Sequence, residues 1–156
     1  MQDPLLCLAL LLALVAVGAT RTRPAPNLAG CWTNQLGSTA DIKMNQDGTL
    51  RGTYKSKVSS TGEQAEGDLI GYQLNFDKPT FGFVVKWTTA SVRGSVTVWT
   101  GQMFDIKSCQ ILHTMWLLRR KSTPDDNWGA TRTGMDVFRR CNAKCGSTAG
   151  DGALGG

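Results

Sequence analysis

The chain has 156 residues, enough for a single domain with its own hydrophobic core. Lys and Arg outnumber Asp and Glu by 17 to 12, and part of the excess falls in two short clusters, Arg119-Arg120-Lys121 and Arg139-Arg140. These clusters lack the interleaved aromatic residues of a nucleic-acid-binding stripe, so we interpret them as solvated strand ends and expect neither a nucleic acid nor a membrane as partner.

The first residues predict a secretory signal peptide. An apolar run over residues 5–17 is too short to span a bilayer comfortably, and Ala19 is placed like a cleavage site. We therefore expect residues 1–19 to be removed and the protein to be secreted into the extracellular space. Asp3 is the only charge before the run, and no Lys or Arg precedes it, so a signal anchor is the alternative.

After a Pro-rich, extended lead-in over residues 20–29, the chain alternates short strand-like runs with turn signals. The runs are rich in β-branched and aromatic residues and contain no proline. They cover residues 31–34, 41–44, 49–54, 68–74, 81–87, 95–104, 109–118 and 131–141. Asn45-Gln46-Asp47-Gly48 predicts a hairpin turn, and residues 123–126 a helical turn.

No long amphipathic helical period interrupts these runs. Eight short strands joined by hairpin-length turns favour an all-β fold, an eight-stranded antiparallel up-and-down β-barrel, with a β-sandwich as the alternative. A closed barrel has no exposed edges and leaves room for one small ligand. We expect the barrel to cover residues 30–141 and the Gly-rich tail, residues 142–156, to be disordered.

Two strands carry an unusual inward pattern. Alternation places hydroxyl and indole side chains together on one face of each strand, namely Ser95, Thr97 and Trp99 on one and Thr114, Trp116 and Leu118 on the other. This pattern is typical of the wall of a ligand cavity. The alternative is a pair of core strands whose Trp and Thr side chains only fill volume.

Eight side chains are candidates for the inner face of the barrel: Trp32, Asn34, Tyr54, Trp87, Thr97, Trp99, Trp116 and Asp136. If all of them face the lumen, it combines aromatic walls with short polar groups. Asn34, Ser38 and Tyr54 can each donate toward one carbonyl oxygen, while Asp136 and Ser56 can accept from N–H groups. These groups could satisfy one another around water, or they could hold a compact ligand with both donors and acceptors.

Catalytic chemistry fits poorly. The sequence has no Gly-rich phosphate loop and no nucleophile elbow, and its single histidine, His113, does not accompany a nucleophile. A paired-carboxylate hydrolase needs two acids in one cleft, and only Asp136 is expected to point inward. We therefore expect no enzyme activity and no cofactor.

The mature chain retains four cysteines: Cys31, Cys109, Cys141 and Cys145. An even number in a secreted chain predicts disulfides, with three possible connectivities. A metal site built from Cys141, Cys145 and His113 is the alternative, but the spacing is poor for zinc, so no metal is expected.

Several segments resemble the avidin and streptavidin family of biotin-binding proteins, over residues 30–140 and in family order. They are Gly30-Cys31-Trp32-Thr33-Asn34-Gln35-Leu36-Gly37-Ser38, Gly52-Thr53-Tyr54, Pro79-Thr80-Phe81-Gly82-Phe83 through Trp87, Thr97-Val98-Trp99-Thr100-Gly101-Gln102, Thr114-Met115-Trp116-Leu117-Leu118-Arg119 and Trp128-Gly129-Ala130-Thr131-Arg132-Thr133-Gly134. The resemblance implies a streptavidin-like barrel that binds biotin with high affinity and catalyses nothing. An antimicrobial use, by sequestering the vitamin, would follow by analogy.

The resemblance also implies a role for each matching position. Asn34, Ser38 and Tyr54 would polarise the ureido carbonyl of biotin, Asp136 and Ser56 would hold the ureido nitrogens, and Thr97 would meet the ring sulfur. Apolar contacts would come from Leu36, Trp87, Trp99, Trp116 and Leu118, and a lid containing Val58 would bring Ser60 and Thr61, with Ser95, to the carboxylate.

The family's assembly implies a homo-oligomer, expected to be a tetramer, in which Trp128 caps a neighbour's ligand and Met115, Thr133 and Met135 face the interface. The cysteine bridge of avian avidin is absent, because Pro26 and Met103 stand at those positions. We expect a Cys31–Cys141 bridge where the last strand returns to the first, with Cys109–Cys145 as the second.

Other functions remain alternatives. A lipocalin-like carrier of another small hydrophobic ligand would need a wider lumen with fewer polar groups. A barrel that has lost its ligand would hold only water, but such a chain would be expected to lack Asn34, Tyr54 or Asp136, and all three are present.

Overall fold

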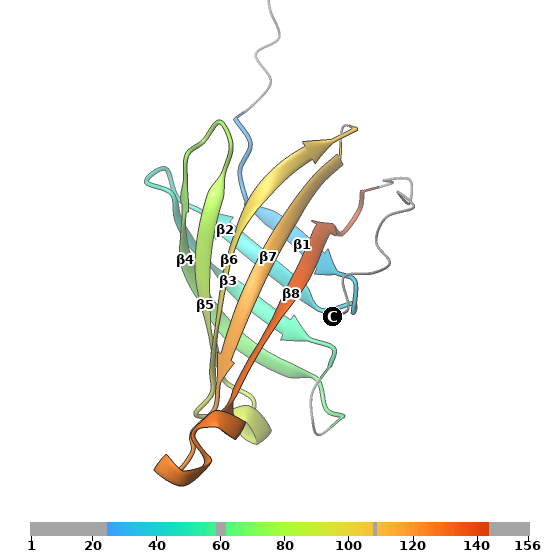
Figure 1. Ribbon diagram of the computed structural model, residues 1–156. Helices are drawn as coiled ribbons and strands as arrows, with labels where there is room; N and C mark the ends of the chain where they lie inside the picture. Colours follow the sequence, from blue (N-terminus) through green and yellow to red (C-terminus); the bar gives the residue numbers. More distant parts are fainter. Residues whose placement is uncertain (1–24, 59–61, 108, 144–156) are drawn as a thin grey trace, which may run out of the picture.

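The computed structural model describes residues 25–58, 62–107 and 109–143. Within them, eight antiparallel strands form a closed barrel in which chain neighbours are also spatial neighbours (Figure 1). The strands are β1 (Gly30–Asn34), β2 (Thr39–Met44), β3 (Thr49–Ser56), β4 (Ala65–Leu74), β5 (Thr80–Trp87), β6 (Val96–Ile106), β7 (Cys109–Arg119) and β8 (Thr131–Arg140). The predicted up-and-down barrel is confirmed, and the sandwich alternative is wrong.

Side-chain alternation explains why these segments form a barrel. In β5, Phe81, Phe83, Val85 and Trp87 are all buried, whereas Val84 between them is exposed. A strand with one apolar face can bury it inside a cylinder and leave the other face outside. The same alternation runs through all ten residues of β4.

The strand boundaries differ from those expected at a few ends. The β3–β4 ladder continues to the Ser56–Ala65 pair, so β4 begins before Asp68 and the connecting loop is shorter than predicted. At the start of β6, the backbone N–H of Ser95 closes a turn onto the carbonyl of Val92, which delays the strand to Val96.

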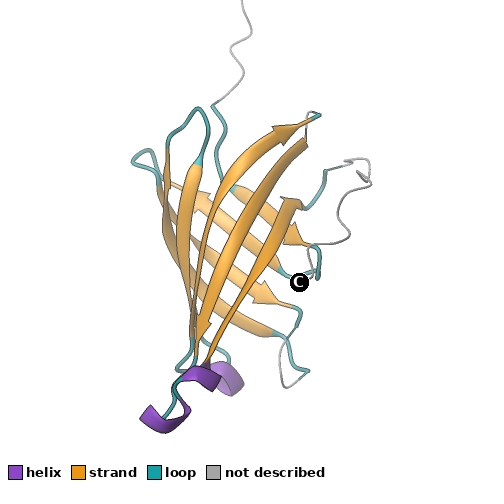
Figure 2. Ribbon diagram, viewed as in Figure 1, coloured by secondary structure: helices purple, strands orange, loops and turns teal. Residues whose placement is uncertain are grey.

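Three short 3-10 helices lie at one end of the barrel (Figure 2). They are η1 (Ala90–Val92), between β5 and β6, and η2 (Pro124–Asp126) and η3 (Trp128–Ala130), between β7 and β8. The expected helical turn near residue 124 is therefore present. The predicted Asn45–Gly48 hairpin turn lies at the opposite end, where the positive φ of Gly48, 84°, favours glycine.

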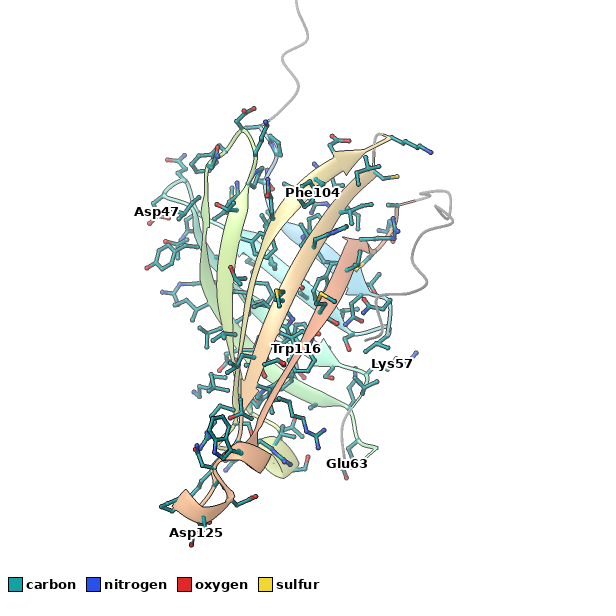
Figure 3. The ribbon with its side chains drawn as sticks, viewed as in Figure 1. Asp47, Lys57, Glu63, Phe104, Trp116 and Asp125 are labelled. Carbon is teal, nitrogen blue, oxygen red and sulfur yellow. A yellow bond between two sulfur atoms is a disulfide. The ribbon has the colours of Figure 1, made fainter. Side chains whose placement is uncertain are left out.

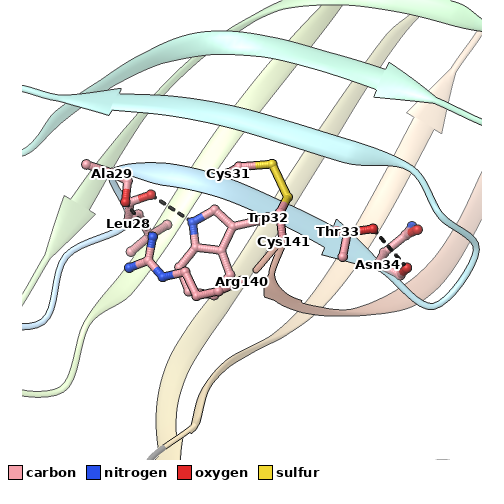
Figure 4. The surroundings of a disulfide bond; sticks show 8 residues. All are labelled: Leu28, Ala29, Cys31, Trp32, Thr33, Asn34, Arg140 and Cys141. Carbon is pink, nitrogen blue, oxygen red and sulfur yellow. Dashed lines mark hydrogen bonds between the residues drawn. A yellow bond between two sulfur atoms is a disulfide. The ribbon is translucent and has the colours of Figure 1, made fainter. Parts of the chain in front are cut away.

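A disulfide joins the first and last strands where the barrel closes (Figure 4). Trp32 pairs with Arg140 across β1 and β8, which brings the Cα atoms of Cys31 and Cys141 to 5.5 Å. The predicted Cys31–Cys141 bridge is confirmed, and it removes Cys141 from the alternative metal site. Cys109 is also disulfide-bonded, and its predicted partner, Cys145, lies outside the described residues.

The lead-in seals the end of the barrel that lies opposite the helices. Leu28 is fully buried, its N–H donates to Oε1 of Gln73, and its carbonyl accepts from the indole N–H of Trp32. The guanidinium of Arg140 lies 3.9 Å from the Trp32 ring centroid and donates to the carbonyls of Asn27 and Ala29. Arg140 is therefore half-buried, and its interpretation as a solvated strand end is wrong.

The remaining sequence expectations concern segments at the two ends of the chain. The predicted signal peptide, residues 1–19, lies outside the described residues, as does the tail from residue 144. Across the described ranges, no helix has the length and apolar character needed to cross a membrane.

Candidate functional site

A cavity of about 390 Å³ occupies the helix-bearing end of the barrel. Figure 3 places Trp116 in that half, whereas Asp47 and Phe104 lie toward the sealed end. The cavity is lined from seven strands and the loops between them by Asn34, Leu36, Ser38, Tyr54, Ser56, Val58, Ala65, Trp87, Val92, Ser95, Thr97, Trp99, Trp116, Leu118, Arg120, Arg132 and Asp136.

Asp136 organises the polar part of this cavity. Its Oδ1 accepts from Nδ2 of Asn34 at 3.1 Å, and its Oδ2 accepts from the indole N–H of Trp99 at 3.0 Å. Asn34 is fixed in turn, because its Oδ1 accepts from the backbone N–H groups of Leu36 and Ser38. These bonds orient side chains from β1, β6 and β8 before any ligand enters.

The burial of Asp136 shifts its ionisation. Only 4% of the residue is exposed, and desolvation raises the pKa of its carboxyl, while hydrogen bonds from Trp99, Asn34 and Gln35 oppose the shift. A buried carboxylate that already accepts two donors offers its remaining lone pairs to an N–H group of a ligand.

Tyr54 stands beside this carboxylate, packed against two indoles. Its ring centroid lies 4.8 Å from that of Trp99 and 5.8 Å from that of Trp87, the latter in an edge-on arrangement. Burial, and then the charge of Asp136, raise the pKa of Tyr54, and a hydrogen bond with Ser38 opposes them. The phenol is therefore a neutral donor at physiological pH.

Aromatic rings form the walls of the cavity. The indole N–H of Trp87 donates to Oγ1 of Thr97 at 2.9 Å, so this ring and this hydroxyl are held together. Trp116 packs over Gly134, where a Cβ atom would stand 2.4 Å from Cζ2 of the indole. Glycine at that position lets the Trp116 ring lie against β8.

The structure brings together most of the predicted site residues, although their roles toward a ligand stay predictions. Ser60 and Thr61 lie outside the described residues. Trp128 is 90% exposed and does not line the cavity of its own chain. Trp32 points inward but belongs to the sealed end, where it packs with Leu28, so it is not a cavity residue.

Two of the expected hydroxyl groups make contacts with the chain itself. Ser56 Oγ donates to the carbonyl of Val58 at 2.6 Å, and Ser38 Oγ accepts from the N–H of Lys57 at 3.0 Å. Both contacts anchor the start of the β3–β4 loop to the rim of the cavity. The side chain of Ser56 is thus near the cavity, with its proton directed at the loop.

Sequence reasoning missed four lining residues: Ala65, Val92, Arg120 and Arg132. The alternation of side chains along the strands could have predicted that the two arginines line the cavity. Arg120 follows Leu118 by two positions, and Arg132 precedes Gly134 and Asp136 on the same face of β8. Arg120 is exposed just past the end of β7, as its interpretation as a solvated strand end predicted, but it also lines the cavity.

The described lining residues provide hydrogen-bonding groups and apolar surface for a ligand. Asp136 is the one acid among the described residues that line the cavity, and His113 is exposed on the outer face of β7. Among the described residues, no group of three His, Cys, Asp or Glu side chains is placed to hold a metal ion. The arrangement suits a compact ligand that presents a polar, flat head to Asp136 and Tyr54 and an apolar body to the indoles.

Comparison with known proteins gives a consistent result. The sequence model of the Avidin family matches residues 23–141. Avidin of Gallus gallus is 44% identical over 147 residues, covering 88% of this chain and 93% of that protein. Avidin-related protein 4/5 of Gallus gallus is 41% identical over 145 residues, with the same coverage of each chain.

Solved structures agree with the sequence comparison. The crystal structure of Xenavidin superposes with a TM-score of 0.67 at 46% identity, covering 73% of this chain and 97% of that one. A biotin-binding protein from chicken superposes with a TM-score of 0.67 at 38% identity, covering 76% and 98% of the two chains.

Proposed function

Because the chain belongs to the avidin family, we propose that it is a secreted protein that binds biotin with high affinity and catalyses no reaction. One observation carries the proposal: Asn34 and Trp99 both donate to Asp136 at the polar end of a cavity whose walls are indoles. A site whose groups are already oriented loses little conformational entropy when it binds.

Biotin matches this cavity group by group. Its ureido oxygen would accept from Asn34, Ser38 and Tyr54, and its ureido nitrogens would donate to Asp136 and Ser56. The fused rings and aliphatic chain would lie between Trp87, Trp99 and Trp116, with Thr97 at the ring sulfur and Leu36, Val58 and Leu118 completing the apolar wall. Ser60, Thr61 and Ser95 would meet the carboxylate. Neutral donors aimed at one carbonyl oxygen strengthen one another in a water-poor site.

We also propose that the protein assembles as a homotetramer. Met115 and Met135 pair across β7 and β8 on the outer face, where they are 62% and 51% exposed, and Thr133 lies beside them. Trp128 is exposed on η3, at the end of the barrel where the cavity lies, as a residue that completes a neighbour's site would be. A secreted tetramer that retains biotin could starve microbes of the vitamin.

A lipocalin-like carrier is not favoured. The cavity holds Asn34, Ser38, Tyr54, Thr97 and Asp136, all buried, and an apolar ligand would leave their hydrogen-bonding capacity unused.

Isothermal titration of the folded, secreted protein with biotin tests the proposal. We expect saturable binding with one site per chain, and native mass spectrometry with and without biotin would report the assembly. Titration with a fatty acid is the matched comparison. Absence of saturable biotin binding would refute the function, and a monomer in both spectra would refute the tetramer.

A further inference from the structure

Two arginines line the mouth of the cavity, and neither has a counterpart among the positions to which the resemblance assigns ligand contacts. Arg132 of β8 lies directly opposite Leu118 of β7. Just past the end of β7, the backbone N–H of Arg120 donates to the carbonyl of Ala130 at 2.9 Å, so the segments that extend β7 and precede β8 stay paired there. Arg120 therefore follows Leu118 on the same face, and both guanidinium groups belong to one stretch of the rim.

No carboxylate neutralises these two guanidinium groups within the described part of the chain. The acid that lines the cavity, Asp136, uses its oxygens for Asn34 and Trp99. Arg120 donates to the carbonyl of Gly129 at 3.3 Å, and the side chain of Arg132 makes neither a hydrogen bond nor an ion pair with any described residue. The mouth is thus cationic and retains unused N–H donors.

The spacing along β8 defines the ligand that could use them. Asp136 lies four positions after Arg132 in β8, which corresponds to about 13 Å along a strand. A ligand whose polar head reaches Asp136 and whose aliphatic chain runs past the indoles would bring its far end to the arginines. Guanidinium groups bind carboxylates through paired, charge-assisted hydrogen bonds.

We propose that Arg120 and Arg132 form a charge-selective mouth that distinguishes ligands with a free terminal carboxylate from ligands whose terminus is a neutral ester or amide. This inference rests on the proposed function, because biotin supplies both the polar head and the carboxylate. It adds a preference for the free vitamin over its neutral conjugates. The serine and threonine contacts expected from the resemblance carry no charge, so they would favour the carboxylate less strongly than two guanidinium groups would.

The experiment compares biotin with biotin methyl ester on the folded, full-length secreted protein. Dissociation constants are measured by competition against radiolabelled biotin for the wild type, Arg120→Gln, Arg132→Gln and the double variant. Arg93→Gln is the matched control, since Arg93 is exposed beside η1 at the same end of the barrel but does not line the cavity. Melting temperatures establish that each variant is folded.

We expect the wild type to prefer the acid over the ester by about 10-fold or more, as for a partly solvated charge-assisted hydrogen bond. The double variant should lose most of that ratio, and Arg93→Gln should keep it. An unchanged ratio in the double variant, or an equal loss of affinity for both ligands, would overturn the charge-selective mouth while leaving biotin binding intact. Failure of the wild type to bind biotin at all would instead overturn the proposed function, and this inference with it.

Discussion

The indole N–H of Trp99 points at the carboxylate of Asp136 with 3.0 Å between Nε1 and Oδ2. The two residues come from β6 and β8, which are not neighbours in the barrel, so the bond crosses the lumen. With the bond from Asn34 to the other oxygen, it fixes the polar end of the cavity in the unliganded protein. The carboxylate and its two donors are therefore oriented before a ligand binds.

Asp136→Ala should weaken biotin binding by roughly 10-fold or more. The substitution removes the acceptor of two buried donors and leaves one ureido nitrogen of biotin without a partner, and each unsatisfied donor costs about 1–3 kcal/mol. The dissociation rate of radiolabelled biotin measures the effect. Asp68→Ala is the control, because Asp68 is exposed and forms an ion pair with Lys86 at 3.9 Å on the outer face of the barrel. A dissociation rate equal to the wild type would contradict the role of Asp136.

Asp136→Asn should change how stability depends on pH. Burial raises the pKa of Asp136 above its ordinary value of 3.8, so the folded state binds this proton more tightly than the unfolded state. The resulting stabilisation is full below pH 3.8 and is lost as pH rises through the raised pKa. We expect the melting temperature of the wild type, relative to that of Asp136→Asn, to fall across this window. Parallel pH profiles for the two proteins would argue against a raised pKa.

Gly134→Ala should disturb Trp116 without breaking the strand. A Cβ atom at residue 134 would stand 2.4 Å from Cζ2 and 2.7 Å from Cε2 of the indole, so the ring must move into the cavity. We expect faster biotin dissociation and altered tryptophan fluorescence. Gly82→Ala in β5 is the control, because its nearest neighbour is the carbonyl oxygen of Trp99 at 3.5 Å, an ordinary contact. Identical fluorescence in both variants would show that Trp116 does not depend on Gly134.

Local alternation was enough to predict much of this molecule. It separated Thr97 and Trp99, which are buried, from Val96 and Val98, which are exposed, and it placed Trp32 inside the barrel. These predictions hold because a strand in a closed barrel can bury only one face. The order of the strands then followed from short connections.

Side-chain alternation could not predict contacts between distant parts of the chain. Arg140 binds the carbonyl of Asn27, 113 residues away, and nothing in the composition around Arg140 distinguishes it from a solvated residue. Arg120 was missed as a lining residue for a different reason, because the cluster of basic residues predicted only solvent exposure. Arg120 is exposed, but alternation from Leu118 also places it on the face that lines the cavity.

Arg140→Lys should lower the free energy of unfolding by roughly 1–3 kcal/mol while leaving biotin binding unchanged. The guanidinium of Arg140 donates hydrogen bonds to the carbonyls of Asn27 and Ala29 and to Oε1 of Gln110, and it lies over the Trp32 ring. A lysine keeps the charge but places a single nitrogen there, so some of these acceptors lose their donor. Because the contacts lie at the sealed end, away from the cavity, stability and binding should separate.

Chemical denaturation of the disulfide-intact protein measures this loss, and titration with biotin tests the separation. Arg51→Lys in β3 is the control, since Arg51 is exposed on the outer face. If Arg140→Lys unfolds at the same denaturant concentration as Arg51→Lys, the arginine does not hold the lead-in. If Arg140→Lys also lowers the affinity for biotin, the sealed end and the cavity are coupled through the barrel wall, and the expected separation of stability from binding is wrong.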